Sequence, residues 1–490
     1  MPGSVVTVQL GQCGNQVGCE LFDTLAREAA ASSPSVRDEI HEVRARVVSL
    51  SLSREKMPTS LLARGRRALL LRVHPPRSRI SPLALVLSLS STARTQAFFR
   101  SGDGAARPSS SSSSSSSPTA RAVLIDMEPK VIASSLKRAR RSSHRWRYDA
   151  NSALAFQSGS GNNWARGYNT YGGLVRDEAL ELVRREAERC DHLGGFLLTQ
   201  SLAGGTGAGL GAFVAEAIRD EHRGATILNH CVWPYESGEV IVQCYNTLLT
   251  LSTLLNVSDG VCVVQNEQLH RACVGALKIK RPTFDDMNGV AATQLAGVLL
   301  PSVARGVTPA GGAGCGRKLM LLHDVSRGAC CDPTMRLLSL RSVPMMPQTS
   351  VDFTTFAWPG LIKRARQMLL TGTTLEEGLD WGVEPGGDGG GRVVTRCLAA
   401  MAFLRGKGAE DADVGALSDP RLFPTWTPSP LSVSHSGARF CGYDASLTLL
   451  SNCQSACPPI GRMLARAYQV KKKRFSPTAR FQHLIAPPFN

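Results

Sequence analysis

Two periods of apolar residues alternate along the first 300 residues. The segment 5–10 alternates apolar and polar side chains as a strand does, and the next segment places Val17, Leu21 and Leu25 on one helical face. The same succession recurs where the apolar run 196–198 leads through a glycine-rich segment into a second helical pattern. Repeated strand-to-helix succession predicts an α/β domain built on a parallel sheet.

Three loops rich in glycine or side-chain amides accompany these patterns. Glycines let backbone N–H groups and a helix N-terminus approach an anion closely. A Walker A loop would need Lys and then Ser or Thr after its last glycine, whereas Leu210 and Gly211 follow here. An ordinary turn explains any single loop, but three together predict a phosphate site of a different nucleotide fold. The loops are Gly11-Gln12-Cys13-Gly14-Asn15-Gln16, Gly159-Ser160-Gly161-Asn162-Asn163-Trp164 and Ala203-Gly204-Gly205-Thr206-Gly207-Ala208-Gly209.

Two carboxylates follow another apolar run. The strand-like segment 122–125 leads to Asp126 and Glu128, and Pro129 ends the turn. Ligands of open α/β sheets bind at the carboxyl ends of the strands, where such a pair suits a hydrated Mg²⁺ that bridges to phosphates. A solvated turn is the alternative, and the neighbouring glycine loops favour the metal site.

The composition fits a large globular protein. Its 490 residues correspond to about three domains, and 43% hydrophobic residues suffice for large cores. The fourteen cysteines show no repeated metal-ligand spacing, and the ten histidines form no ligand cluster. No leader pattern opens the chain, and the longest apolar stretch of its basic region, 83–87, is too short to span a membrane. A reducing cytosol is therefore expected.

The net charge of +17 suggests a nucleic-acid partner, but it is concentrated in two segments. Residues 37–117 hold fourteen Lys or Arg against five acids, and residues 462–480 hold seven basic residues and no acid. The first segment also contains nine serines, 109–117, and its composition predicts a disordered insertion. A natural insertion and translated non-exonic sequence both explain it, and we favour the second.

The three loops, in this order, resemble the phosphate loops of the tubulin family. The motif Gly204-Gly205-Thr206-Gly207-Ala208-Gly209 is highly specific to tubulins and their prokaryotic relatives. The resemblance covers residues 1–30 and 119–300 well and weakens afterwards. It implies GTP and Mg²⁺ as ligands. It also implies a tubulin-like α/β fold, with a nucleotide-binding parallel sheet domain, a central helix, a second smaller α/β domain and C-terminal helices.

The resemblance also assigns site residues one by one. Glu239 stands where tubulins place an acid near the ribose, but Gln243 replaces a second acid. Asn266 and Asn288 match two asparagines that contact the guanine. Phe284 matches the aromatic residue that stacks on the base, and on a helix capped by Thr283 it would share a face with Asn288. A core position is the alternative for Phe284. At the phosphates the resemblance implies Gly11, Gln12, Cys13, Gly161, Asn162, Gly204, Gly205, Thr206 and Gly207, with Mg²⁺ near Asp126 and Glu128 through water.

The resemblance predicts four regions and three departures from the family. Leu321 stands where most tubulins have an acid that completes the nucleotide site of the neighbouring subunit, so we expect slow GTP turnover. Ser, Gly and Cys crowd 432–458, where helices are expected, and a basic run at 471–474 replaces an acid-rich end. The regions are a GTP-binding domain over 1–281 interrupted by 37–117, a central helix over 282–300, a second α/β domain over 301–408 and a helical region over 409–490.

The implied function is that of a GTP-binding cytoskeletal protein. The segments Trp233-Pro234-Tyr235 and Leu404-Arg405-Gly406-Lys407 are most similar to a branch of the family associated with triplet microtubules of centrioles, basal bodies and cilia. Other tubulins or microtubules would then be head-to-tail partners in the cytoplasm, with no membrane involved. Two alternatives stay open. A self-contained nucleotide hydrolase would turn over without a partner, and a nucleic-acid-binding protein would lose affinity steeply with salt.

Overall fold

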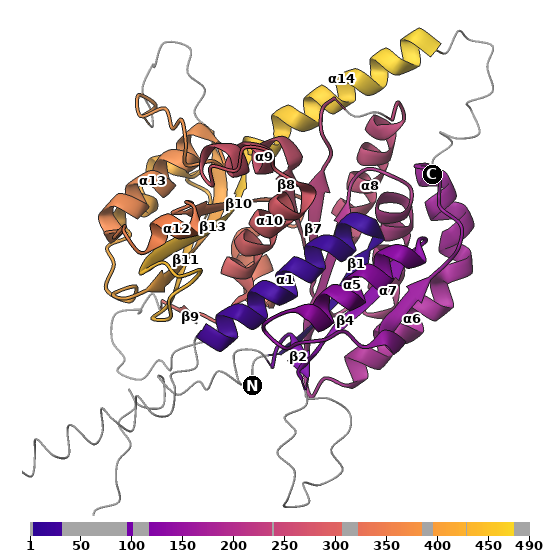
Figure 1. Cartoon of the computed structure of the whole chain (residues 1–490). Coiled ribbons are helices and arrows are strands. Elements are labelled where there is room, and N and C mark those ends of the chain that lie inside the picture. The colour runs from indigo at the N-terminus through magenta and orange to yellow at the C-terminus, as the bar shows by residue number, and fades with distance from the viewer. Residues whose placement is uncertain are drawn as a thin grey trace, which may run out of the picture.

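An eleven-stranded sheet runs through the centre of the molecule (Figure 1). Its strand order is β5-β4-β1-β6-β7-β8-β10-β13-β11-β12-β9. The structure is a computed structural model, and it describes the chain at residues 3–31, 96–100, 117–237, 240–305, 322–384, 395–427 and 429–474.

Six neighbouring strands at one end of the order run parallel, which confirms the predicted α/β class. Every residue of β1, β4 and β7 is buried, as expected for parallel strands that helices cover on both faces. These strands are β1 (Ser4–Leu10), β4 (Ala122–Asp126), β5 (Ala153–Ala155), β6 (Leu193–Ser201), β7 (Ile227–Trp233) and β8 (Gly260–Gln265).

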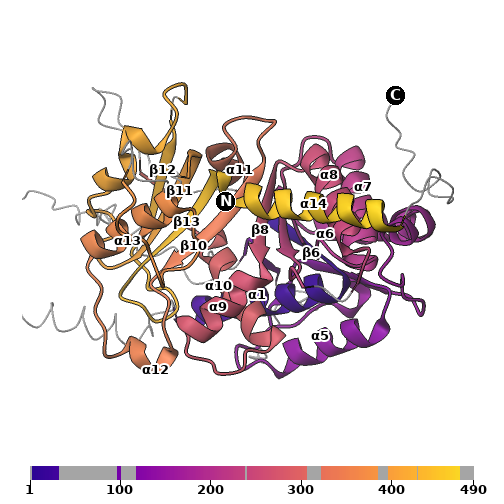
Figure 2. The ribbon, with the colours of Figure 1, turned by 90° about the horizontal axis from the view of Figure 1, so that it is seen from above.

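Helices cover the two faces of the parallel sheet. One face packs against α1 (Gly11–Ala31), α5 (Pro129–Arg141), α9 (Asn266–Gly275) and α10 (Phe284–Leu299). The opposite face packs against α6 (Gly172–Glu188), α7 (Gly211–Glu221) and α8 (Gln243–Val257). The C-terminal helix α14 (Cys457–Arg474) lies beside α8 (Figure 2). No helix of the described segments is long and apolar enough to cross a bilayer.

The central helix α10 begins where the sequence predicts its cap. The Thr283 side chain accepts a hydrogen bond from the Asp286 backbone N–H, and the Asp286 carboxylate accepts one from the Thr283 backbone N–H. This reciprocal cap satisfies two backbone donors of the helix start. It fixes Phe284 as the first helical residue.

The second half of the chain continues the same sheet. Strand β10 (Leu337–Val343) is parallel to β8 and antiparallel to β13 (Ala445–Cys453). Beyond β13 lie β11 (Cys397–Gly406), β12 (Leu431–Ser436) and β9 (Val303–Ala304). Besides α14, the described α-helices of this half are α11 (Leu322–Ala329), α12 (Gln348–Val351) and α13 (Trp358–Thr371).

Helices were expected over 432–458, and this prediction is wrong. Strands β12 and β13 occupy most of the segment, and α14 is the helix that follows them. All nine residues of β13 are buried between β10 and β11, so cross-strand packing there outweighs the local pattern. The helical region assigned to 409–490 is thus partly sheet.

The predicted insertion is also too long. Within 37–117, residues 96–100 belong to the fold, because strand β2 (Phe99–Arg100) pairs with β3 (Thr119–Ala120). Phe99 is buried, with its ring 5.4 Å from that of Phe22 on α1. The buried Arg100 guanidinium lies 2.6 Å from the Asp149 carboxylate. Residues 37–95 and 101–116 lie outside the described residues.

Candidate functional site

The predicted site residues gather at one edge of the parallel sheet. Parallel strands end at the same edge, and the segments that follow β1, β4, β5, β6 and β8 carry the predicted side chains. Leu10 of β1 lies opposite Ile125 of β4, so Gly11 and Asp126 begin neighbouring turns. A crevice outside the carboxyl ends of strands is where open α/β sheets bind ligands.

The first and third glycine loops touch each other. A methyl group placed on Gly11 would lie 2.7 Å from the backbone nitrogen of Gly207, closer than real side chains approach. Gly11 also has a φ of +69°, a conformation that favours glycine. Gln12 is exposed and Cys13 is half-buried at the start of α1. Desolvation raises the pKa of the Cys13 thiol to about 12, so this thiol is protonated at neutral pH.

The second loop closes on the third from the other side. The Ser160 and Thr206 hydroxyl groups are 3.0 Å apart, and a methyl group on Gly205 would lie 2.3 Å from the Ser160 oxygen. Gly161 and Asn162 both have positive φ and are exposed, so this loop turns sharply at its tip. The three loops therefore form one constellation.

Asn246 on α8 holds the second loop in place, and no sequence motif pointed to this residue. Its side-chain N–H group donates to the Asn162 carbonyl at 2.8 Å, and its oxygen accepts from the Trp164 backbone N–H at 3.2 Å. Asn246 is buried and more than 80 residues from the loop, so only the fold brings them together.

Asp126 offers a carboxylate oxygen to a cation. The residue is 2% exposed, and its Oδ1 accepts a hydrogen bond from the Glu128 backbone N–H. Its Oδ2 is buried with no hydrogen-bond partner among the described residues. Desolvation raises the pKa of Asp126 to about 6. A hard cation would satisfy this orphaned oxygen, and Glu128 stands exposed beside it, so the donor set fits Mg²⁺.

The predicted base-contacting residues lie on two helices that pack together. Asn266 is the first residue of α9, directly after β8, and Phe284 opens α10. The Phe284 side chain is 61% exposed, which excludes a core position for its ring. Asn288 lies one turn further along α10 and is 6% exposed. Helix α10 packs on α1, whose first turn carries the first glycine loop.

The segment after β7 carries the expected ribose contact. Glu239 itself lies outside the described residues, as do Leu321 and residues 37–95 and 101–116 of the predicted insertion. The neighbouring Glu236 makes two contacts that hold it in place. Its backbone N–H donates to the Glu267 carboxylate, and its own carboxylate lies 2.5 Å from the Arg462 guanidinium of α14. Gln243 donates to the Tyr235 carbonyl at 2.7 Å. The C-terminal helix therefore braces this side of the site.

Helix α11 lies at the opposite edge of the sheet. Leu322 contacts the start of β6 at Gly195, and His323 lies 3.3 Å from the Thr226 hydroxyl, which precedes β7. The nine residues of β6 span about 25 Å at the usual rise per residue. Asp324 on α11 is therefore remote from the glycine loops of its own chain.

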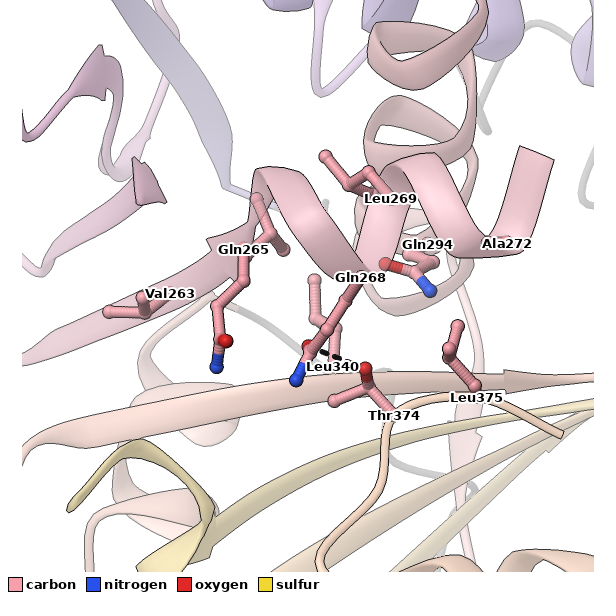
Figure 3. Close-up of a pocket in the computed structure, with 10 residues that line it drawn as sticks. Val263, Gln265, Gln268, Leu269, Ala272, Gln294, Leu340, Thr374 and Leu375 are labelled. Carbon is pink, nitrogen blue, oxygen red and sulfur yellow. Dashed lines mark hydrogen bonds between the residues drawn. The ribbon is translucent and has the colours of Figure 1, made fainter. Parts of the chain in front are cut away.

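A small cavity with a mixed apolar and polar lining lies between α9 and the second half of the sheet (Figure 3). Its volume is about 10 Å³, which is room for one water molecule and not for a nucleotide. Gln268 accepts a hydrogen bond from Thr374 at 2.6 Å across it, and Gln294 of α10 also lines it. The cavity lies where the first half of the chain packs against the second half.

Comparison with known proteins agrees with this geometry. Residues 4–274 match the model of the Tubulin/FtsZ family, GTPase domain. The chain belongs to the Tubulin/FtsZ family. It is 33% identical over 479 residues to the "Tubulin delta chain" of Macaca fascicularis, which covers 95% of this chain and 92% of the relative. The same identity and length hold for the "Tubulin delta chain" of Homo sapiens.

A more distant relative matches a shorter part of this tubulin-family chain. The "Tubulin beta chain" of Porphyra purpurea is 28% identical over 295 residues, which covers 60% of this chain and 51% of the relative. The longer match to delta chains agrees with the delta-like segments Trp233-Pro234-Tyr235 and Leu404-Arg405-Gly406-Lys407. The family match confirms the tubulin family and the α/β fold that the three loops imply. The chain is therefore a GTP-binding protein of the tubulin family.

Proposed function

We propose that this chain binds GTP with Mg²⁺ at the carboxyl edge of its parallel sheet and acts as a delta-like tubulin. The contact between Gly11 and Gly207 carries the proposal, because it brings two glycine loops to one point where a side chain has no room. Backbone N–H groups of these loops would then surround a phosphate group.

Each part of the nucleotide has a matching part of the site. Gln12, Cys13, Asn162 and Thr206 frame the phosphates, together with the glycines at 11, 161, 204, 205 and 207. Glu239 is assigned to the ribose. Asn266 and Asn288 read the guanine edge, and the exposed Phe284 ring covers its face, an interaction typically worth about 1 to 3 kcal/mol.

The metal is assigned to Asp126 and Glu128. When bound, Mg²⁺ would neutralise charge on the phosphate oxygens. Asp126 is poised for this role because its buried Oδ2 has no partner among the described residues. Glu128 would act through a water molecule, since it is exposed at the first residue before α5.

The distance between the two edges of the sheet supports head-to-tail association. Asp324, the acid of α11, lies at the other end of strands about 25 Å long and could reach a nucleotide only on another copy or another tubulin. Such heterologous contacts build open polymers. We assign the chain to microtubules of centrioles, basal bodies and cilia, because its relatives of nearly equal length are named tubulin delta chains.

The test is binding of a fluorescent GTP analogue to the purified full chain with Mg²⁺. Gly11→Ala should lose binding, because the added methyl group would collide with Gly207 and the φ of Gly11 is positive. Gly173→Ala is the matched control, since a methyl group there meets nothing within 4 Å. Equal affinity of both variants, with both folded, would refute the assigned phosphate site.

A further inference from the structure

One surface of the molecule carries a charge that neither the fold nor the nucleotide site uses. From Pro129 to Tyr148 the chain has seven Lys or Arg and no acid. This stretch comprises α5 and the loop after it, and α5 lies on the outer side of α1 (Figure 1). The basic residues, all exposed, are Lys130, Lys137, Arg138, Arg140, Arg141, Arg145 and Arg147.

Helix stability accounts for only part of this charge. Basic residues in the last turn of a helix complement its dipole, and this explains Arg138, Arg140 and Arg141. Lys130 lies instead in the first turn, where a cation is unfavourable, and Arg145 lies beyond the helix end. Lys137 and Arg141 are four residues apart, a like-charge spacing that destabilises a helix.

Most of these cations have no acidic partner in the described part of the chain. Arg138 is the exception, because its guanidinium contacts the Glu20 carboxylate on α1 and lies 3.2 Å from Asp285 on α10. The Lys137 and Arg141 side chains form no hydrogen bond or ion pair with any described residue. Within the described segments, nothing neutralises their charges.

An open groove of about 580 Å³ runs beside these two cations. Lys137, Arg138 and Arg141 line one wall, and Asp23 and Asp285 line the other. The acids of the second wall are engaged, since Asp23 accepts from the Trp146 indole N–H at 3.1 Å and Asp285 pairs with Arg138. The groove therefore offers free cations together with acceptor oxygens.

We propose that this groove and the outer face of α5 bind an acidic segment of another polypeptide. Carboxylates of such a segment would meet Lys137 and Arg141, while its backbone N–H groups would meet the carboxylate oxygens of the second wall. A phosphodiester backbone has acceptors and no N–H donors, so it could meet the cations of the groove but could not donate to Asp23 and Asp285. The chemistry of the groove thus favours an acidic peptide over a nucleic acid.

The test measures binding of a fluorescein-labelled Glu-rich peptide to the full chain by anisotropy at low salt, with a Gln-rich peptide of equal length as reference. The double variant Lys137→Glu/Arg141→Glu should weaken binding by about tenfold or more. The matched control is Arg176→Glu/Arg223→Glu, which reverses two exposed charges on the opposite side of the sheet. It should change affinity by less than about twofold.

Position is checked by carbodiimide cross-linking, which should join the peptide to Lys137 or Lys130. Equal weakening in both double variants, or equal binding of the Glu-rich and Gln-rich peptides, would overturn the proposal. Cross-links confined to lysines outside α5 would also overturn it. An oligonucleotide that binds more tightly than the peptide and is weakened by the same variant would make this face a nucleic-acid surface instead.

Discussion

The side-chain amide of Asn246 donates a hydrogen bond to the backbone carbonyl of Asn162, 2.8 Å away. Asn246→Ala would leave this carbonyl and the Trp164 N–H group without their partner. We expect the free energy of unfolding to fall by about 1 to 3 kcal/mol and GTP affinity to weaken, because the second loop loses its anchor. Denaturant titration and nucleotide binding measure the two effects. Asn256→Ala, at an exposed position of the same helix, should change neither.

Asn288→Asp is expected to weaken GTP binding. An aspartate carboxylate only accepts hydrogen bonds and cannot donate to the guanine carbonyl oxygen, and xanthosine triphosphate carries the same oxygen, so it should not restore binding. Competition against a fluorescent GTP analogue measures the change. Wild-type protein should prefer GTP strongly over ATP, and equal affinity for the two would show that the base site is misassigned.

His230 should make the folded state sensitive to acid. It is fully buried, neither ring nitrogen has a hydrogen-bond partner among the described residues, and desolvation lowers its pKa to about 4. Between pH 6.5 and 4 the unfolded chain binds a proton that the folded chain does not, so stability falls as pH falls. The loss attributable to His230 approaches about 3 kcal/mol at pH 4.

His230→Leu tests this assignment, because it removes the titrating group from a buried position. The dependence of the unfolding free energy on pH between 7 and 4 should become shallower in this variant. His270→Gln, at an exposed position of α9, is the control and should keep the wild-type slope. An unchanged slope in His230→Leu would contradict the role of this histidine.

A filament of this chain alone is expected to turn GTP over very slowly. Leu321 cannot orient a water molecule or accept its proton, and a positioned general base typically contributes about 100-fold to 10,000-fold. Phosphate release from Leu321→Glu should therefore exceed that of the wild type. Fast wild-type release that Asp324→Ala abolishes would instead identify Asp324, three residues later at the start of α11, as the acting acid.

Replacing residues 37–94 by a short Gly/Ser linker should leave GTP binding intact, because no phosphate loop lies within them and loop closure costs little. Extending the deletion to residue 117 should destabilise the protein, because it removes Phe98 and Phe99 from the core. Thermal unfolding and nucleotide binding distinguish the two deletions. Equal stability of both would show that β2 is dispensable.

The sequence predicted that the three loops meet at the carboxyl edge of the sheet, because each loop is a local feature. Each glycine loop follows its own strand, so motif and position could be read together, and the cap at Thr283 needed only four residues. Contacts between distant segments gave no such signal. Asn246 and the link between Glu236 and Arg462 join residues 84 and 226 positions apart.

The C-terminal half was harder for a related reason. Strand β13 contains Ser, Thr, Asn and Cys among its leucines, a composition without a clear strand period. It is a strand because β10 and β11 pair with it on both sides, which is a tertiary cause. Phe98 and Phe99 were likewise obscured by the basic, serine-rich sequence around them.

Strand β10 pairs with β8 in the first half and with β13 in the second, at registers that include Leu337 opposite Val261 and Ser339 opposite Ser451. A hinge between the halves would have to break this ladder. The two halves therefore share one continuous sheet. Strain introduced at the nucleotide edge would reach the far half as torsion of the shared sheet, or as sliding of α10 along α1, and not as a swing of one lobe against the other.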